Sequence, residues 1–224
     1  MKDDIAEIFL YLKRRALSVF VFCQNGFIMK KWFFLFLFPG MFFVAGAQNR
    51  NDMEIKLEAP DLSRGKAVMQ ALSERQSTRE FSDKELSIKD LSDLLWAANG
   101  INRPESGKRT APSALNRQDV KVYVCMKSGS YLYEPGKQTL VLLSEGDARP
   151  VDIAPVCLVL VADSNEMMAA IDAGIVSQNV SLFCSGTGLA TVPRASMDKA
   201  ALREALKLSD KQEPMLNHPV GYFK

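Results

Sequence analysis

The segment Arg75-Gln76-Ser77-Thr78-Arg79-Glu80-Phe81 has the clearest chemical potential in this chain. Its two arginines flank a pair of hydroxyls, directly after a run that is predicted to be helical. A guanidinium group binds phosphate through two parallel hydrogen bonds, and serine and threonine hydroxyls add further donors. The spacing therefore indicates a site for a phosphate or a phosphorylated cofactor. The alternative is a solvated helix end, because basic residues there interact favourably with the negative pole of the helix.

Other residues that could carry chemistry are few. His218 is the only histidine, which excludes sites built from several histidines, and its place at the start of a predicted strand indicates a structural role. No glycine-rich dinucleotide fingerprint or P-loop occurs, so a nicotinamide nucleotide is expected to bind only transiently. Cys125, Cys157 and Cys184 lie in apolar runs without metal-binding spacing, which predicts buried thiols. The sequence leaves open whether two of them form a disulfide.

The elements that must position these residues follow from apolar periodicity and capping signals. Helices are predicted over residues 63–74, 87–99, 165–185 and 198–206. Strands are predicted over residues 119–126, 131–133, 139–143, 156–162, 189–192 and 219–223. Helices and strands do not alternate strictly, which indicates an α+β fold with a mixed or antiparallel sheet. Residues 101–117 are expected to form a long loop, and loops of that length are usually functional or disordered.

The N-terminal part of the chain predicts export. Residues 29–47 combine a basic start, a short apolar run and an Ala-Gly-Ala end, the pattern of a cleaved signal peptide. A membrane anchor is the alternative, but the apolar run is shorter than the ~20 residues that a span requires. Residues 1–28 are then interpreted as a mis-called extension, and residues 48–62 as a linker or arm. The mature protein is expected to be periplasmic without a stable membrane span, or cytoplasmic or membrane-anchored if the leader is retained.

Composition and charge indicate a globular protein that does not bind nucleic acid. The chain is 47% hydrophobic and 24% charged, which is ordinary for a globular protein. Its formal net charge of +2 is too small to indicate a nucleic-acid partner, and no block of lysine and arginine forms a basic patch.

Four sequence elements, in order, resemble the FMN-dependent nitroreductase family. The first is ALSERQSTREF, at residues 71–81, which is similar to the family's arginine-serine signature. The second comprises LSDLLWAANGINRP and KRTAPSALN, which resemble the helix and Pro-Ser loop of the branch that includes azoline-forming peptide oxidases. The third is DAGIVSQNVSLFCSGTGLATVPRAS, at residues 172–196, and the last is the terminal PVGYFK. The resemblance covers nearly all of residues 68–224.

The resemblance implies a nitroreductase-like FMN-binding domain over residues 63–224. It implies a mixed or antiparallel sheet flanked by helices, and a domain-swapped style of homodimer with FMN at the interface. The cofactor-binding positions that it implies fall in four groups. They are Arg75, Gln76, Ser77 and Arg79 for phosphate, ribityl and pyrimidine edge; Pro112, Ser113, Ala114 and Asn116 from the partner subunit; Pro193, Arg194, Ala195 and Ser196 beside the reactive flavin N5; and Lys224 for phosphate.

The resemblance further implies that FMN passes hydride by a ping-pong cycle from NAD(P)H to a small acceptor such as a nitroaromatic or a quinone. Arg79 is the candidate for stabilising negative charge on the reduced flavin. No other side chain is assigned to catalysis, because the flavin carries the hydride chemistry.

Two departures from the family pattern are Gln76 in place of a second arginine and Ser196 in place of glycine. The stretch Leu115-Asn116-Arg117 replaces a glycine-containing one, which argues against peptide tailoring. The alternatives are a flavin-binding protein without turnover, a component of an exported redox complex, and a membrane-tethered domain that has lost its flavin.

Overall fold

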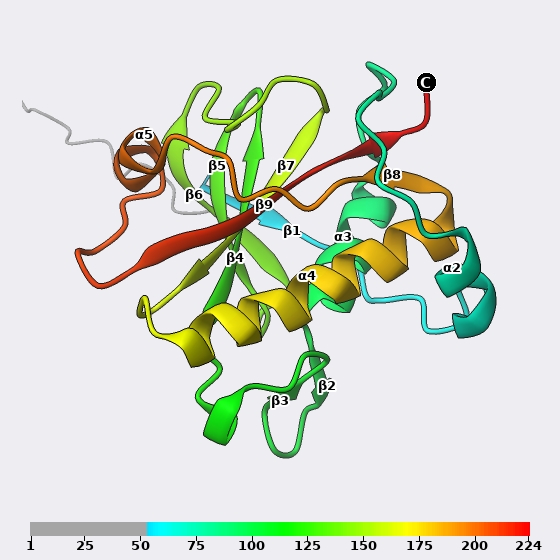
Figure 1. The fold of residues 1–224 in the computed structure, drawn as a ribbon, viewed down its shortest axis with the longest axis horizontal. Coiled ribbons are helices and arrows are strands. Elements are labelled where there is room, and N and C mark those ends of the chain that lie inside the picture. Colours follow the sequence, from blue (N-terminus) through cyan, green and yellow to red (C-terminus); the bar gives the residue numbers. More distant parts are fainter. Residues whose placement is uncertain (1–52) are drawn as a thin grey trace, which may run out of the picture. The chain divides into compact units, whose positions relative to one another are not determined.

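The computed structural model describes residues 53–224, so the predicted extension and signal peptide, and the start of the arm, lie outside the described residues. The described chain is built on one antiparallel sheet of seven strands (Figure 1), in the order β1-β6-β5-β4-β7-β9-β8. The strands are β1 (Glu54–Lys56), β4 (Val120–Met126), β5 (Gly129–Glu134), β6 (Thr139–Glu145), β7 (Val156–Ala162), β8 (Leu189–Thr191) and β9 (Glu213–Tyr222). The helices are α2 (Val68–Glu74), α3 (Ile88–Asn99), α4 (Met167–Thr187) and α5 (Lys199–Ala205).

The predicted α+β fold is confirmed, and the sheet is antiparallel at every pairing of these seven strands. Strand β7 shows why three layers form. Its alternate residues point to opposite faces, so that Leu158 and Leu160 pack with α3 and α4, whereas Cys157 and Val159 pack with Leu202 of α5. The strand was predicted to be buried on both faces, and each of its residues is buried.

The ends of the helices follow their sequence signals. The Ser87 hydroxyl accepts a hydrogen bond from the backbone N–H of Asp90 at 3.0 Å, so the predicted capping position of α3 is confirmed. Helix α3 ends at Gly100, as expected. Helix α4 ends at Gly188, whose φ of 76° is the left-handed conformation that glycine adopts without strain.

Helix α4 is apolar and long enough in principle to cross a membrane, but it serves as a core helix here. Ala169, Ala173 and Ser177 face the sheet and are buried. Gly174, in contrast, faces outward with open space beside it. The small residues of α4 therefore serve mainly the core of the chain itself.

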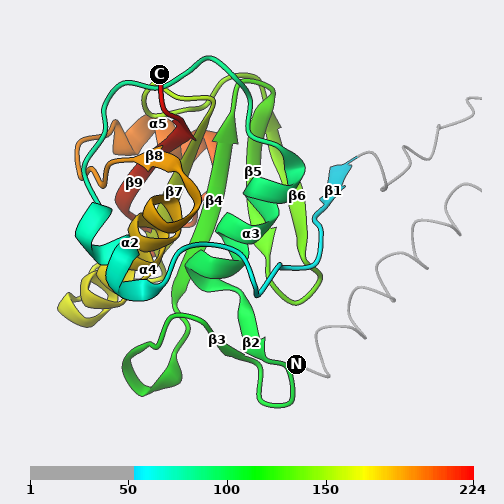
Figure 2. The ribbon, with the colours of Figure 1, turned by 90° about the vertical axis from the view of Figure 1, so that its right-hand side faces the viewer.

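Four expectations about local structure were wrong. The expected arm contains strand β1, which pairs with β6. The expected loop 101–117 contains a hairpin and a helical turn (Figure 2). The hairpin is formed by β2 (Ile101–Arg103) and β3 (Lys108–Arg109), and the turn is η2 (Ala114–Asn116). Helix α2 begins at Val68 instead of residue 63. Strand β9 begins at Glu213, so His218 lies inside the strand instead of at its start. Strand β1 and the early start of β9 depend on pairing with residues distant in sequence, which local periodicity does not report.

The predicted burial of the thiols is confirmed. Cys125, Cys157 and Cys184 are free and buried. Burial raises the pKa of all three thiols, that of Cys125 to about 12, so all three remain protonated at neutral pH.

Candidate functional site

The segment 75–81 leaves α2 and runs beside the sheet edge. The backbone N–H of Thr78 donates to the carbonyl of Thr191 in β8 at 3.0 Å. Phe81 then forms an isolated antiparallel bridge with Phe223, so the segment reaches the end of β9. Figure 1 shows this teal segment passing close to the C-terminus. The two predicted regions at 75–81 and at the C-terminus, distant in sequence, are therefore adjacent in the fold.

The predicted residues of this segment face solvent. Arg75, Gln76, Ser77 and Arg79 are exposed, and so is Lys224, which follows Phe223. Neither Arg75 nor Arg79 forms an ion pair with any residue of the described chain. Two guanidinium groups beside the same sheet edge suit an anionic ligand, because no carboxylate within residues 53–224 neutralises them.

The segment 193–196 continues from β8 and runs beside β9. Arg194 and Asn217 exchange both backbone hydrogen bonds, at 2.9 and 2.7 Å. The side-chain amide of Asn217, which is fully buried, donates to the carbonyls of Arg194 at 3.2 Å and Ser196 at 3.1 Å. Pro193, Ala195 and Ser196 are exposed above this anchor. The segment 193–196 is thus hydrogen-bonded to β9 on one side and exposed to solvent on the other.

A cavity of about 330 Å³ lies beside this edge. Its lining includes Gln76, Thr191 and Phe223, together with Ser181 and Ser185 of α4. This volume is at the lower end of the range for small-molecule sites, ~300–1,000 Å³. Of the predicted site residues only Gln76 lines the cavity.

The predicted loop 112–116 lies elsewhere in the same chain. The backbone N–H of Ala114 donates to the carboxylate of Asp172, at 3.0 and 3.1 Å to its two oxygens, near the start of α4. The segment 75–81 instead begins beside the other end of α4, where Ser185 donates to the carbonyl of Ala71. From Asp172 to Ser185 the helix rises ~20 Å. Pro112, Ser113, Ala114 and Asn116 are therefore not brought together with the other predicted residues within one chain.

A buried polar group under the site was not predicted. His218 is fully buried, with Nε2 at 2.8 Å from the Ser177 hydroxyl and Nδ1 at 3.3 Å from the Thr191 hydroxyl. Thr191 donates its proton to the carbonyl of Pro219 at 2.9 Å, so its oxygen accepts from Nδ1–H and Nε2 accepts from Ser177. Burial lowers the pKa of His218 to about 4. The neutral imidazole thereby joins α4 to β8.

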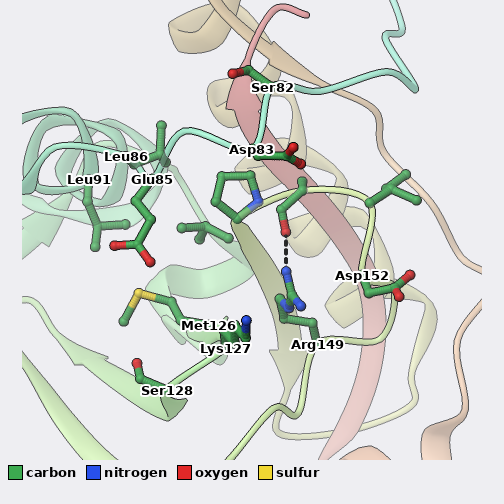
Figure 3. A pocket seen from close by; sticks show the side chains of 14 residues that line it. Ser82, Asp83, Glu85, Leu86, Leu91, Met126, Lys127, Ser128, Arg149 and Asp152 are labelled. Atoms are coloured by element: carbon green, nitrogen blue, oxygen red, sulfur yellow. Dashed lines mark hydrogen bonds between the residues drawn. The ribbon is translucent and has the colours of Figure 1, made fainter.

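A cavity of about 590 Å³, larger than the one at the β8–β9 edge, contains none of the predicted residues (Figure 3). Arg149 enters it, donating to the carbonyl of Ala154 at 2.8 Å and binding Asp147 through two hydrogen bonds. These bonds raise the pKa of Arg149 and lower that of Asp147. The cavity is bordered by carboxylates of Asp83, Glu85 and Asp152. Its polar loop residues had no distinguishing spacing in the sequence.

Comparison with known proteins identifies the chain. The sequence model of the nitroreductase family matches residues 72–222. The chain belongs to the nitroreductase family. A protein of Methanocaldococcus jannaschii named "Putative nitroreductase" is 30% identical over 196 residues, which are 75% of this chain and 96% of that protein. Family membership supports an oxidoreductase activity.

Solved structures agree with this assignment. A crystal structure of a "putative nitroreductase" from Ralstonia eutropha JMP134 has a TM-score of 0.72 at 36% identity, covering 77% of this chain and 90% of that one. A structure from Parabacteroides distasonis ATCC 8503, titled "Putative NADH dehydrogenase/NAD(P)H nitroreductase", has a TM-score of 0.51 at 18% identity, covering 70% and 86%. The latter similarity establishes the fold alone.

The buried histidine generates a prediction about stability. Because the pKa of His218 falls from 6.5 in the unfolded chain to about 4 in the fold, the unfolded state binds more protons between these pH values. The free energy of unfolding should therefore decrease as the pH falls from 7 to 4, by up to about 3 kcal/mol from this residue. Urea denaturation at pH 7 and pH 5 should show a smaller decrease for His218→Asn. Ser177→Ala, which leaves the imidazole buried, is the control and should show the full decrease. If the unfolding free energy fell equally between pH 7 and pH 5 in all three proteins, the titration of His218 would not be its cause.

Proposed function

We propose that this nitroreductase-family chain is an FMN-dependent oxidoreductase whose cofactor lies along the β8–β9 edge. The observation that carries the proposal is the meeting of residues 75–81, residues 193–196 and Lys224 at this edge, with Arg75 and Arg79 unpaired within the described chain. A bound FMN would supply the hydride chemistry, taking hydride from NAD(P)H and passing it to a nitroaromatic, quinone or similar acceptor.

The donors at this edge fit the cofactor. Arg75 and Lys224 are exposed cations suited to the phosphate, and Ser77 adds a hydroxyl between the two arginines. Arg79 is the cation proposed to face the flavin ring, where it would stabilise negative charge without rearrangement. The backbone N–H groups of Ala195 and Met197 have no acceptor among the described residues, and they are proposed to face the flavin ring.

The proposal requires a second copy of the chain. Residues 112–116 lie ~20 Å along α4 from the β8–β9 edge, so they reach a flavin only from a partner subunit. Exposed apolar side chains support a homodimer: Met69 of α2 is 77% exposed and Leu115 is 95% exposed, and Val68, Leu72, Met167, Met168 and Ile171 are also exposed. Apolar side chains gathered near both ends of α4 are typical of a surface that is covered in the assembly.

The reductant and the compartment are further parts of the proposal. NAD(P)H is supported by the name of the Parabacteroides structure, which mentions NAD(P)H nitroreductase. Export is supported by the signal-peptide pattern of residues 29–47. Because NAD(P)H is confined to the cytoplasm, an exported form would need another electron donor, and cell fractionation separates the two cases.

Purification with added FMN tests the function itself. We expect a yellow protein whose absorbance near the flavin maximum is bleached by NADH or NADPH without oxygen and restored by a quinone or nitroaromatic. A yellow protein that every reductant leaves unchanged would favour the alternative, a flavin-binding protein without turnover. A colourless protein that ignores added FMN would contradict both.

The role of Arg75 is tested by FMN titration. Arg75→Ala should weaken FMN binding by about 1.5–3 kcal/mol, the contribution of a charge-assisted hydrogen bond. The matched control is Arg103→Ala, an equally exposed arginine on the β2–β3 hairpin, which should bind FMN like the unaltered protein. Equal affinities for both variants would mean that Arg75 is only a helix-end charge.

The dimer is tested by placing a charge in its proposed surface. Leu115→Asp should shift the protein toward monomer in analytical ultracentrifugation and should lower FMN occupancy at the same time, because residues 112–116 belong to the partner's site. Ile153→Asp, at an exposed apolar residue beside the large cavity, is the control. A Leu115→Asp dimer with full FMN occupancy would contradict the proposed assembly.

A further inference from the structure

We propose that Asn217 is a positioning residue that turns two backbone N–H donors, those of Ala195 and Met197, toward the flavin ring. This inference rests on the proposed function. It starts from the side chain of Asn217, which is fully buried in β9 and lies directly beneath the exposed segment 193–196. None of the sequence motifs contains this residue.

The orientation of the Asn217 amide is fixed by its neighbours. Its Nδ2 donates to the carbonyls of Arg194 and Ser196, at 3.2 and 3.1 Å. Its Oδ1 is 3.8 Å from the thiol sulfur of Cys157, which stays protonated and acts as the donor. A flipped amide would place an oxygen against two carbonyl oxygens, so only one orientation satisfies all the groups. Both N–H groups of the Asn217 amide therefore bind carbonyls of the segment 193–196.

The consequence for the segment follows from the geometry of the peptide bond. In a trans peptide the C=O and the following N–H point in opposite directions. Because the carbonyls of Arg194 and Ser196 point inward to Asn217, the N–H groups of Ala195 and Met197 point away from it. Neither N–H has an acceptor among the described residues, whereas the N–H of Arg194 is bonded to Asn217.

Two donors held in this way are suited to a ligand with acceptor atoms on one edge. A flavin ring has such an edge at N5 and its neighbouring carbonyl, and donors that are already oriented lose little entropy on binding. Without the Asn217 amide, the carbonyl of Ser196 would lose its partner and the peptide at 196–197 would be free to rotate. The carbonyl of Arg194 would keep its bond to the backbone N–H of Asn217 but would lose the second bond from the amide. Asn217 thus acts on the flavin through the segment without touching it.

The chain offers a matched control. Asn99, in α3, is also a buried asparagine whose Nδ2 donates to a backbone carbonyl, that of Val120 at 2.8 Å. The substitutions Asn217→Asp and Asn99→Asp remove the donors without changing the shape of the side chain. Both should lower the melting temperature. Only Asn217→Asp should also weaken FMN binding, on the order of tenfold, and shift the absorption spectrum of the bound flavin at saturating FMN.

A spectrum and an affinity that match those of the unaltered protein in Asn217→Asp would overturn the inference, since a merely structural asparagine would behave like Asn99. Amide hydrogen exchange of the unaltered full chain, followed by NMR, tests the inference if Asn217→Asp does not fold. Without FMN, the N–H of Arg194 should be protected and those of Ala195 and Met197 should exchange rapidly; with FMN, the latter two should become protected.

The outcomes separate this inference from the proposed function. If FMN binds and Ala195 and Met197 gain no protection, the inference about Asn217 fails while the proposed function stands. If the unaltered protein binds no FMN, the proposed function fails and the role of Asn217 toward a flavin fails with it. Protection of Ala195 and Met197 without FMN would show that their donors are already occupied, which also overturns the inference.

Discussion

Backbone pairing along β9 is the interaction on which the rest of the candidate site depends. On one side the strand pairs with β7 from Glu213 to Val220, and every residue of β7 is buried. On the other side the same strand holds β8, residue Arg194, and Phe81 beyond its end. Three segments that are distant in sequence are therefore fixed relative to one another by hydrogen bonds to a single strand, which is itself anchored in the core.

The length of α4 imposes the second constraint. The helix covers one face of the sheet and separates two sets of predicted residues, because Asp172 binds the loop 112–116 near its start and Ser185 binds α2 near its end. A single chain cannot bring both sets to one ligand. Exposed apolar residues near both ends of the helix are consistent with a two-fold pairing in which the start of one α4 lies near the end of the other.

Local signals predicted the parts of the fold that depend on local physics. The continuous apolar run of β7, the Ser87 cap and the terminating Gly188 each appear where the sequence indicated, because burial, capping and left-handed φ are encoded within a few residues. Strand β1 and the β2–β3 hairpin were not predicted, since three-residue strands exist only through their partners. In the site, the resemblance indicated the exposed residues of three segments, and His218 was predicted to be structural, although its partners were not. Asn217 carried no signal, because its role arises from contacts across the fold.

The two buried polar residues of β9 explain how an exposed edge is kept in one conformation. The amide of Asn217 donates to two carbonyls of segment 193–196. Both ring nitrogens of His218 are hydrogen-bonded, one to Ser177 of α4 and the other to Thr191 of β8. Apolar residues at these positions would fill the same space, but one at position 217 would leave the carbonyl of Ser196 unpaired and allow the edge to adopt other arrangements. Fully satisfied buried hydrogen bonds specify one geometry. Thr191 also accepts the N–H of Thr78, so the same network extends to the segment that carries Arg75 and Arg79. The exposed donors of this edge are therefore positioned from within the core, by residues that no ligand needs to contact.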